Sequence, residues 1–421
     1  MARANVEIAL LVCVTAACGA AAAAAPPAPQ PSVVPPERAD DLRPTPAASP
    51  STPARAATAT PPAPAAPPEQ PATPTRAAPA AQGQDVAATG QGPAAGPGAH
   101  AAARPSTIPL STGDGAPGDA DIAAGDEAFE RGDLAAAERR YEAARVAAPR
   151  SVAAAVGLSR VRIARADVPL DYAAGKGNRE VAAAAQDLAR AAKAAPSFGP
   201  AFVELGRALL LLGDAPAAIE ALRKGVARMP DEPEARSQLG IALLATGHAP
   251  EAVTELERAA RLDPGSAARH GNLGTALIMA GRTREAIVEY ETRARLEDGD
   301  ARAHSDLGTA LLGTQDLQRA TSELQRAVQL EPQRASFHSN LGFAWQQSGR
   351  IDRALAEYRE ALRLDPNLVS AWINLATALA LDPKSRGEAR AALAKARALS
   401  PDDPRVKANL EELDALEKAG P

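Results

Sequence analysis

Apolar and small residues recur along the chain in an order that repeats every 34 residues. Five such units follow one another between Gly199 and Leu368, from GPAFVELGRALLLLGDAPAAIEALRKGVARMPDE to ASFHSNLGFAWQQSGRIDRALAEYREALRLDPNL. Each unit has Leu-Gly near its start and a repeated Ala pattern in its second half, and most have Pro near the end. A fixed period of this length indicates a repeat architecture in place of independent domains.

The spacing within a unit predicts two short helices. In the unit 233–266, Ala252, Leu256 and Ala259 lie at i, i+4 and i+7, which places them on one stripe of a helix. Gly247 stands where the first helix ends, and Asp263-Pro264 ends the second. One such hairpin cannot bury its apolar stripe alone, so we expect neighbouring hairpins to stack.

This pattern resembles the tetratricopeptide repeat. The resemblance implies an all-α fold, an α-solenoid in which helix-turn-helix units form a right-handed superhelix. We place the repeat domain at 118–403 and a C-terminal capping helix in 404–421, within which Pro404–Lys418 is amphipathic. The expected units are 118–151, 152–196, 199–232, 233–266, 267–300, 301–334, 335–368 and 369–403.

The second unit is longer than the others. Its helices are expected at Val152–Ala166 and Arg179–Ala195, and the insertion between them, 167–179, exceeds the family length by about 13 residues. One interpretation is that the insertion, around Tyr172 to Asn178, contacts an enzyme of which this chain is an accessory subunit.

The N-terminus predicts an export signal at 1–18. Ile8 to Ala17 is an apolar run too short to span a bilayer but suited to a signal peptide. It ends in Thr-Ala-Ala-Cys-Gly, which resembles a bacterial lipobox, although Thr15 stands where Leu is usual. The resemblance implies that Cys18 carries lipid and that Gly19 directs the protein to the outer membrane, facing the periplasm. The alternatives are cleavage between Ala20 and Ala25, giving a periplasmic or secreted protein, and no export.

Residues 19–117 predict a disordered tether. Most of the 38 Pro residues lie before residue 117, and we find no apolar period in that stretch. Pro-rich chain favours extended conformations, so the stretch is expected to act as a spacer between the lipid anchor and the repeats.

Composition narrows the function classes. The net charge is only −5 and we find no basic stripe with interleaved aromatics, so nucleic acid is not an expected partner. The two Cys residues are Cys13 and Cys18, which leaves the predicted repeats without a thiol nucleophile. Lys176 in AAGKGNRE lacks the spacing of a P-loop, and neither HExxH nor GxSxG occurs. We expect no enzyme activity and no cofactor.

Three regularly spaced histidines could suggest a metal site, but the expected distance between neighbouring units argues against one. His270, His304 and His338 are 34 residues apart and occupy position 4 of successive units. Helices packed side by side are about 8–10 Å apart, whereas zinc needs nitrogen at about 2.0–2.1 Å. Phe202 and Trp372 fill the same position in other units, which indicates a packing role. We therefore expect no metal site.

In tetratricopeptide repeats the first helix of each unit lines a concave groove through positions 2, 5, 6, 9, 12 and 13. Position 6 here is mostly amide or acidic, and amides can both donate to and accept from a peptide backbone. An aliphatic column from Leu210 to Leu312 would instead suit an amphipathic helix, or be partly buried. The predicted partner-binding residues are Gln238, Asn272, Asp306, Asn340, Asn374, Arg207, Ile241, Thr275, Thr309 and Phe343, and Glu204 also occupies position 6.

The resulting prediction is a protein–protein interaction scaffold, a lipoprotein that binds a peptide or protein partner in its groove and serves assembly in the cell envelope. A second interpretation is an assembly factor for outer-membrane secretin or pilus components that uses its convex or edge surfaces. The accessory-subunit interpretation is the third.

Overall fold

The computed structural model describes residues 108–169 and 172–418. The predicted signal, Cys18 and the predicted tether as far as residue 107 lie outside the described residues. Seventeen α-helices and one short 3-10 helix, η1 (Pro383–Ser385), make up the regular structure of the described part, which contains no strand. The all-α prediction is confirmed.

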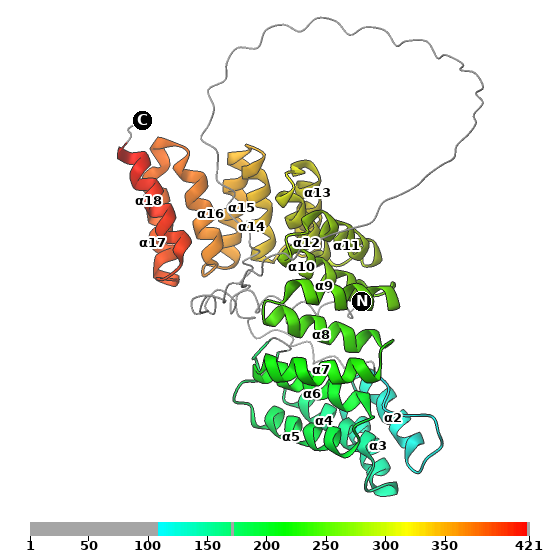
Figure 1. Cartoon of the computed structure of the whole chain (residues 1–421). Coiled ribbons are helices and arrows are strands. Elements are labelled where there is room, and N and C mark those ends of the chain that lie inside the picture. The colour runs from blue at the N-terminus through cyan, green and yellow to red at the C-terminus, as the bar shows by residue number, and fades with distance from the viewer. Residues whose placement is uncertain (1–107, 170–171, 419–421) are drawn as a thin grey trace, which may run out of the picture. The chain divides into compact units, whose positions relative to one another are not determined.

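The helices alternate in two series along the chain (Figure 1). The first helices of the hairpins are α2 (Asp119–Glu130), α4 (Val152–Arg165), α6 (Gly199–Leu212), α8 (Pro233–Ala245), α10 (Ala267–Met279), α12 (Ala301–Gly313), α14 (Ala335–Gln347) and α16 (Val369–Ala380). The second helices are α3 (Leu134–Ala147), α5 (Arg179–Ala194), α7 (Ala215–Arg228), α9 (Ala249–Leu262), α11 (Thr283–Leu296), α13 (Leu317–Leu330), α15 (Ile351–Leu364) and α17 (Arg386–Leu399). A final helix, α18 (Pro404–Lys418), follows.

Helix starts agree with the 34-residue period. The first helices from α6 to α16 begin at the first residues of the predicted units. The first helices from α6 to α14 end where the chain turns left-handed, as at Gly281, whose φ of 74° glycine adopts without strain. Gln315 takes the equivalent place in the unit 301–334 with φ 61° and shows that the turn geometry, not the residue type, is repeated.

A small residue lets the two helices of a hairpin approach closely. A Cβ added at Gly240 would lie 2.5 Å from Cγ of Leu256, and one at Gly274 would lie 2.7 Å from the Tyr290 ring. The large side chain of the second helix therefore occupies the space that the glycine leaves open. The Leu-Gly pair of the five units from Gly199 to Leu368 is a packing device for this contact.

Hairpins stack in chain order. Each second helix packs on its own first helix and on the first helix of the next unit. The apolar core consequently continues from one hairpin to the next, as a solenoid requires. Helix α18 packs on both α16 and α17, with Val406 and Leu413 buried.

The insertion caps the C-terminal end of α6. The amide N–H groups of Ala173 and Gly175 donate to the carbonyls of Leu210 and Leu211, at 3.0 and 2.9 Å, and the Tyr172 hydroxyl donates to the Gly213 carbonyl. Carbonyls at a helix C-terminus have no partner within the helix, so these donors satisfy them. This contact gives the described part of the insertion a structural role.

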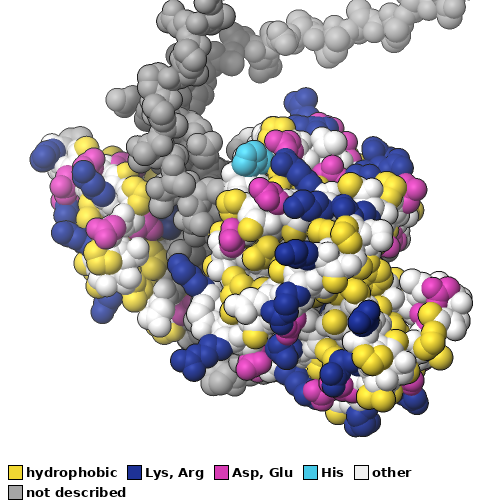
Figure 2. All heavy atoms as spheres, turned by 60° about the horizontal axis from the view of Figure 1, so that its bottom comes forward, with side chains coloured by type: hydrophobic (Ala, Val, Ile, Leu, Met, Phe, Trp, Pro, Cys, Tyr) yellow, Lys and Arg dark blue, Asp and Glu magenta, His cyan; other side chains and the backbone are white. Residues whose placement is uncertain are grey.

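Neighbouring second helices are linked by surface ion pairs. Arg223 of α7 pairs with Glu251 of α9, and Arg319 of α13 pairs with Glu291 of α11. Figure 2 shows basic and acidic side chains interspersed on the face turned to the viewer, with apolar side chains between them. Within residues 108–169 and 172–418, we find no helix with the length and apolarity needed to cross a bilayer.

Candidate functional site

The first helices form a face along the repeats. Helix α2 contacts α4, α4 contacts α6, α6 contacts α8 and α8 contacts α10, and further along the chain α12 contacts α14 and α14 contacts α16. We call the surface made by positions 2, 5, 6, 9, 12 and 13 of these helices the inner face. It is the surface on which the sequence predicts a partner.

The inner face of α2, α4 and α6 holds a piece of the chain itself. Residues Ile108–Gly113, which we call the docked segment, lie against these three helices and contain no helix or strand. The N–H of Leu110 donates to Oδ2 of Asp126 at 2.7 Å, and the N–H of Ser111 donates to the same oxygen at 3.2 Å. The Ile108 carbonyl accepts a 2.7 Å bond from Arg160. These bonds are made by the segment's main chain.

Arg160 is the centre of this arrangement. Its side chain is 2% exposed; Nε donates to Oε1 of Glu204 at 2.9 Å, and Nη1 lies 3.5 Å from Oδ1 of Asp126. Burial by itself would lower the pKa of the Arg160 guanidinium. The nearby carboxylates of Glu204 and Asp126 outweigh this effect of burial and raise the pKa. Burial and the nearby Asp126 carboxylate also raise the pKa of Tyr141, whose hydroxyl donates to Asp126.

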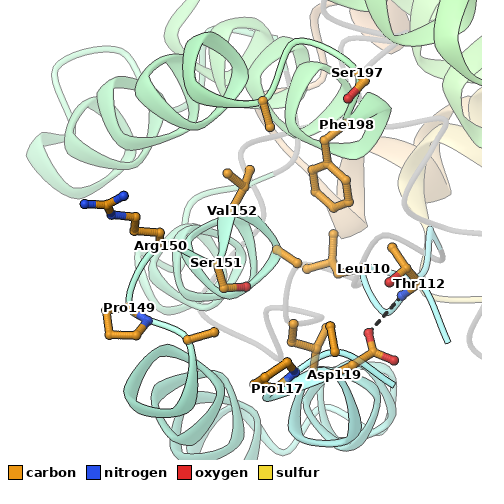
Figure 3. Close-up of a pocket in the computed structure, with 15 residues that line it drawn as sticks. Leu110, Thr112, Pro117, Asp119, Pro149, Arg150, Ser151, Val152, Ser197 and Phe198 are labelled. Carbon is orange, nitrogen blue, oxygen red and sulfur yellow. Dashed lines mark hydrogen bonds between the residues drawn. The ribbon is translucent and has the colours of Figure 1, made fainter. Parts of the chain in front are cut away.

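The far end of the docked segment is held by Asp119 at the start of α2. Its carboxylate accepts from the N–H of Thr112 at 2.9 Å (Figure 3). It also accepts from the N–H of Gly113 at 3.0 Å and from the Ser111 hydroxyl. A cavity of about 740 Å³ opens beside Leu110 (Figure 3). Its lining includes Thr112, Asp119, Ile122, Val152 and Phe198, from the segment, α2, the start of α4 and the turn before α6.

The docked segment differs from the prediction, which placed it in the disordered tether 19–117. Ile108 and Leu110 are 3% and 1% exposed and belong to the apolar core of the repeats. The sequence carries a faint signal, because Ile108 and Leu110 interrupt a stretch dominated by Pro, Ala and Gly. A second signal is the charge at position 9 of the first three units, Asp126, Arg160 and Arg207, where the units from residue 233 onward have Ile, Thr or Phe.

Several predicted groove residues are buried within the repeats. Glu204, Gln238, Ile241 and Asn272 are among the buried residues, and Gln238 donates to Glu234 at 2.9 Å. The aliphatic column is buried at Leu210, Leu244 and Leu312 and half-buried at Ile278. Arg207 lies 3.7 Å from Glu204 and is half-buried.

Other predicted groove residues are half-buried: Thr275, Asp306, Thr309, Asn340, Phe343 and Asn374. The hydroxyls of Thr275 and Thr309 donate hydrogen bonds to backbone carbonyls of their own helices. Asn340 donates one amide N–H to Ser305 at 3.2 Å, which leaves its side-chain carbonyl available within the described part of the chain. The assignment of the ten predicted residues to a partner site stays a prediction.

Asp306 belongs to a second buried charge cluster. The fully buried Arg293 donates to Asp306 at 2.6 Å and to Asp300 at 2.7 Å. Burial opposes the charge on Arg293, and the two carboxylates outweigh it and raise its pKa. Gly271 makes room for this side chain, since an added Cβ would lie 3.0 Å from Cδ of Arg293. The cluster joins α11 to α12 and limits how far Asp306 can serve a partner.

The three histidines are held by a repeated pair of acceptors. Each donates from Nδ1 to a Glu 19 residues later and faces, through Nε2, the carbonyl of the residue six positions earlier. Arg236 makes the same two contacts in its unit, with Glu255 and the Pro230 carbonyl, and Trp372 donates to the Pro366 carbonyl. In the five units from residue 233 onward, position 4 therefore supplies a donor that ties the first helix to the turn before it. The pairs are His270 with Glu289, His304 with Glu323 and His338 with Glu357.

These contacts predict a pH dependence of stability. Each ring nitrogen faces an acceptor, so the two contacts favour the charged imidazole, and the bond to Glu raises the pKa of all three histidines. A raised folded-state pKa contributes stability that is complete below the ordinary His value of about 6.5 and is lost as pH rises through the folded value. We expect the urea midpoint of the protein to fall between pH 6 and pH 8.

The triple variant His270→Arg, His304→Arg and His338→Arg should remove this slope, because Arg236 shows that arginine makes both contacts at position 4. His248→Arg changes an exposed histidine outside the series and should keep the wild-type slope. Equal slopes in wild type and the triple variant would contradict the prediction.

Comparisons with known proteins agree on the architecture. Family models described as "Tetratricopeptide repeat" match residues 122–170, 172–233, 209–277 and 243–307, and one described as "TPR repeat" matches 346–382. Together they match more than half of the chain. No curated protein sequence matches.

Solved structures with similar folds include the fragment of MamA from residue 41 onward from Desulfovibrio magneticus RS-1. It is 24% identical with a TM-score of 0.39, over 40% of this chain and 96% of that one. YrrB, described as a TPR protein with an unusual peptide-binding site, is 22% identical with a TM-score of 0.37, over 46% of this chain and 99% of its own.

The Cut9–Hcn1 hetero-tetramer of the APC/C matches over 72% of this chain and 57% of that one, with a TM-score of 0.50 and 18% identity. At that identity the likeness concerns the fold alone. The family matches, the hairpins, most of which have a glycine at the close approach, and their stacking in chain order agree. The chain therefore belongs to the tetratricopeptide repeat family.

Proposed function

We propose that this protein is a protein–protein interaction scaffold of the cell envelope, which binds an extended segment of a partner protein on its inner face. The observation that carries the proposal is the docked segment. Five side-chain contacts, from Asp119, Asp126 and Arg160, hold its main chain. The inner face of the first three hairpins thus has the chemistry to bind an extended peptide backbone.

The partner is proposed to lie over α12, α14 and α16. Asn340 has an unused side-chain carbonyl, and no contact of the Asn374 amide is seen within the described residues. Phe343 stands half-buried between them in the sequence and offers an apolar surface. Amides that can donate and accept, beside an aromatic ring, suit an extended peptide with an apolar side chain. The first three hairpins are already occupied by the docked segment.

The experiment is photo-crosslinking in the native envelope with the full chain. A photoreactive amino acid at Phe343 should form an adduct with a partner, whereas one at Val288, which is 57% exposed on the second helix α11, should not. Adducts from Val288 alone would favour the convex-surface interpretation and reject the proposed site.

Replacing both groove amides, Asn340→Ala and Asn374→Ala, should lower the yield of the Phe343 adduct at least tenfold without changing the helical circular dichroism signal. Removing hydrogen bonds to a bound backbone costs about 0.5–1.5 kcal/mol each, so two losses give roughly that factor. Asn367→Ala, in the exposed turn before α16, is the matched control and should leave the yield unchanged. An unchanged yield in the double variant would reject the amides as recognition groups.

The location in the envelope rests on Cys18, and we propose that it is lipidated and anchors the protein. Cys18→Ser should move the protein from the membrane fraction to the soluble fraction, because two or more acyl chains are needed for stable anchoring and the variant would have none. Immunoblotting of fractions after salt and detergent washes measures this. Retention of the Ser variant in the detergent-extracted fraction would reject the anchor.

A further inference from the structure

We propose that the inner face of α2, α4 and α6 is a second peptide-recognition site, and that the docked segment is its intramolecular occupant. The site would take a partner segment with two apolar side chains separated by one residue and followed by small polar residues. This inference deepens the proposed function and rests on it. It adds a sequence preference and a competition that controls access.

The main-chain contacts define what any occupant needs. Asp126 accepts from two successive N–H groups, those of Leu110 and Ser111, and Asp119 accepts from the next two, those of Thr112 and Gly113. Four consecutive donors are thus satisfied by two carboxylates. An occupant of this stretch must present free N–H groups at all four positions, so Pro is excluded from each of them.

Proline is allowed just before these donors. Arg160 binds the carbonyl of Ile108 at 2.7 Å, and the next contact is the N–H of Leu110. The residue between them, Pro109, therefore needs no donor of its own. Proline restricts φ and favours extended chain on both of its sides, so it prepares the segment for binding.

Two apolar side chains supply the selectivity. Ile108 belongs to the same core cluster as Val203 and Leu210 of α6, and Leu110 belongs to a cluster with Ile122 of α2. Burying a side chain of this size contributes about 1.5–3 kcal/mol. The spacing of two residues places both side chains on one side of an extended chain.

The cavity beside Leu110 indicates that the site accepts a larger group than the one it holds. It measures about 740 Å³, and Phe198 and Val152 line it together with Leu110 (Figure 3). An aromatic ring has more surface than leucine to place against such walls. A partner segment with Phe in place of Leu110 should therefore bind more tightly than the chain's own sequence.

Covalent attachment explains how the segment can act as a competitor. It enters α2 directly, through Asp114 to Gly118, so its effective concentration at the site is on the order of millimolar. A free peptide with micromolar affinity must overcome this local concentration. Partner segments that match the pattern better than the chain's own segment would displace it, and weaker ones would not.

The test measures binding of a fluorescein-labelled peptide with the sequence of residues 105–113, PSTIPLSTG, to the full-length protein. Ile108→Asp with Leu110→Asp should release the segment, since each change would bury a charge in an apolar cluster. We expect peptide affinity at least tenfold higher for this double variant than for wild type. Val146→Asp with Val288→Asp adds the same charge at exposed positions and should bind like wild type.

The peptide with Phe at the Leu110 position should bind the released protein more tightly than PSTIPLSTG, and a peptide with Pro at the Ser111 position should not bind. The inference would be overturned if the double variant keeps its helical signal and binds neither the Leu peptide nor the Phe peptide. In that case the docked segment only covers the end of the solenoid.

A second measurement applies if the double variant loses helical structure. The measurement is hydrogen exchange of the wild-type protein with and without excess Phe peptide. The peptide should displace the segment, so the Leu110 and Ser111 amides should exchange faster in its presence. Unchanged exchange would overturn the inference. Crosslinking at Phe343 tests the proposed function independently of peptide binding to the second site. An adduct without peptide binding rejects only the second site, and peptide binding without an adduct rejects only the site over α12, α14 and α16.

Discussion

Arg160→Met is expected to lower the free energy of unfolding of the first three hairpins by about 3–5 kcal/mol, the range for removing one partner of a buried ion pair. The side chain is 2% exposed and faces Glu204, which is 4% exposed, and Asp126. Methionine fills a similar volume, so the loss is mainly electrostatic. Both carboxylates would lose the guanidinium that compensates for their removal from water.

The same change removes the donor to the Ile108 carbonyl. The docked segment should therefore loosen together with α2 and α4, while hairpins beyond α8 keep their protection. Hydrogen exchange resolved along the chain measures this, because repeat arrays need not unfold in a single step.

Arg165→Ala is the matched control for this change. Arg165 pairs with Glu138 at 2.7 Å, but both side chains are more than 40% exposed. An exposed ion pair contributes about 0–1 kcal/mol. If Arg160→Met were no more destabilising than Arg165→Ala, the buried cluster would not be what joins the first three hairpins.

Leu256→Ala is expected to cost about 2–5 kcal/mol, the range for removing a buried leucine from a core that cannot collapse around the cavity. Leu256 is fully buried, and its Cγ lies 2.5 Å from where a Cβ on Gly240 would stand. Glycine has no side chain to move into the space. The cavity therefore stays open between α8 and α9.

The effect of Leu256→Ala should be centred on α8 and α9 and extend to their neighbours α7 and α10, because each hairpin is stabilised by the next. Urea denaturation gives the total loss, and hydrogen exchange gives its location. Leu296→Ala removes a side chain that is 41% exposed and should cost less than about 1 kcal/mol. Similar losses for the two variants would contradict the packing role of the Leu-Gly pair.

The sequence alone determined the repeat, and with it the helices. Helix formation and the close approach within a hairpin depend on residues at most one unit apart, such as Gly240 and Leu256. Such pairs recur every 34 residues, so the pattern predicts where α6, α8 and the later first helices begin. The last helix, Pro404–Lys418, also follows from local periodicity, because its apolar residues lie on one side.

Only the tertiary structure decided what occupies the inner face. The bond from Arg160 to Ile108 joins residues 52 positions apart, and that from Arg160 to Glu204 joins residues 44 positions apart. These separations do not follow the repeat. Composition placed Ile108 and Leu110 in the predicted tether, and stacking of three hairpins was needed to create the apolar and charged surface that holds them. Periodic patterns report contacts between neighbouring units, whereas a segment that crosses several units is bound by a surface that exists only after they have stacked.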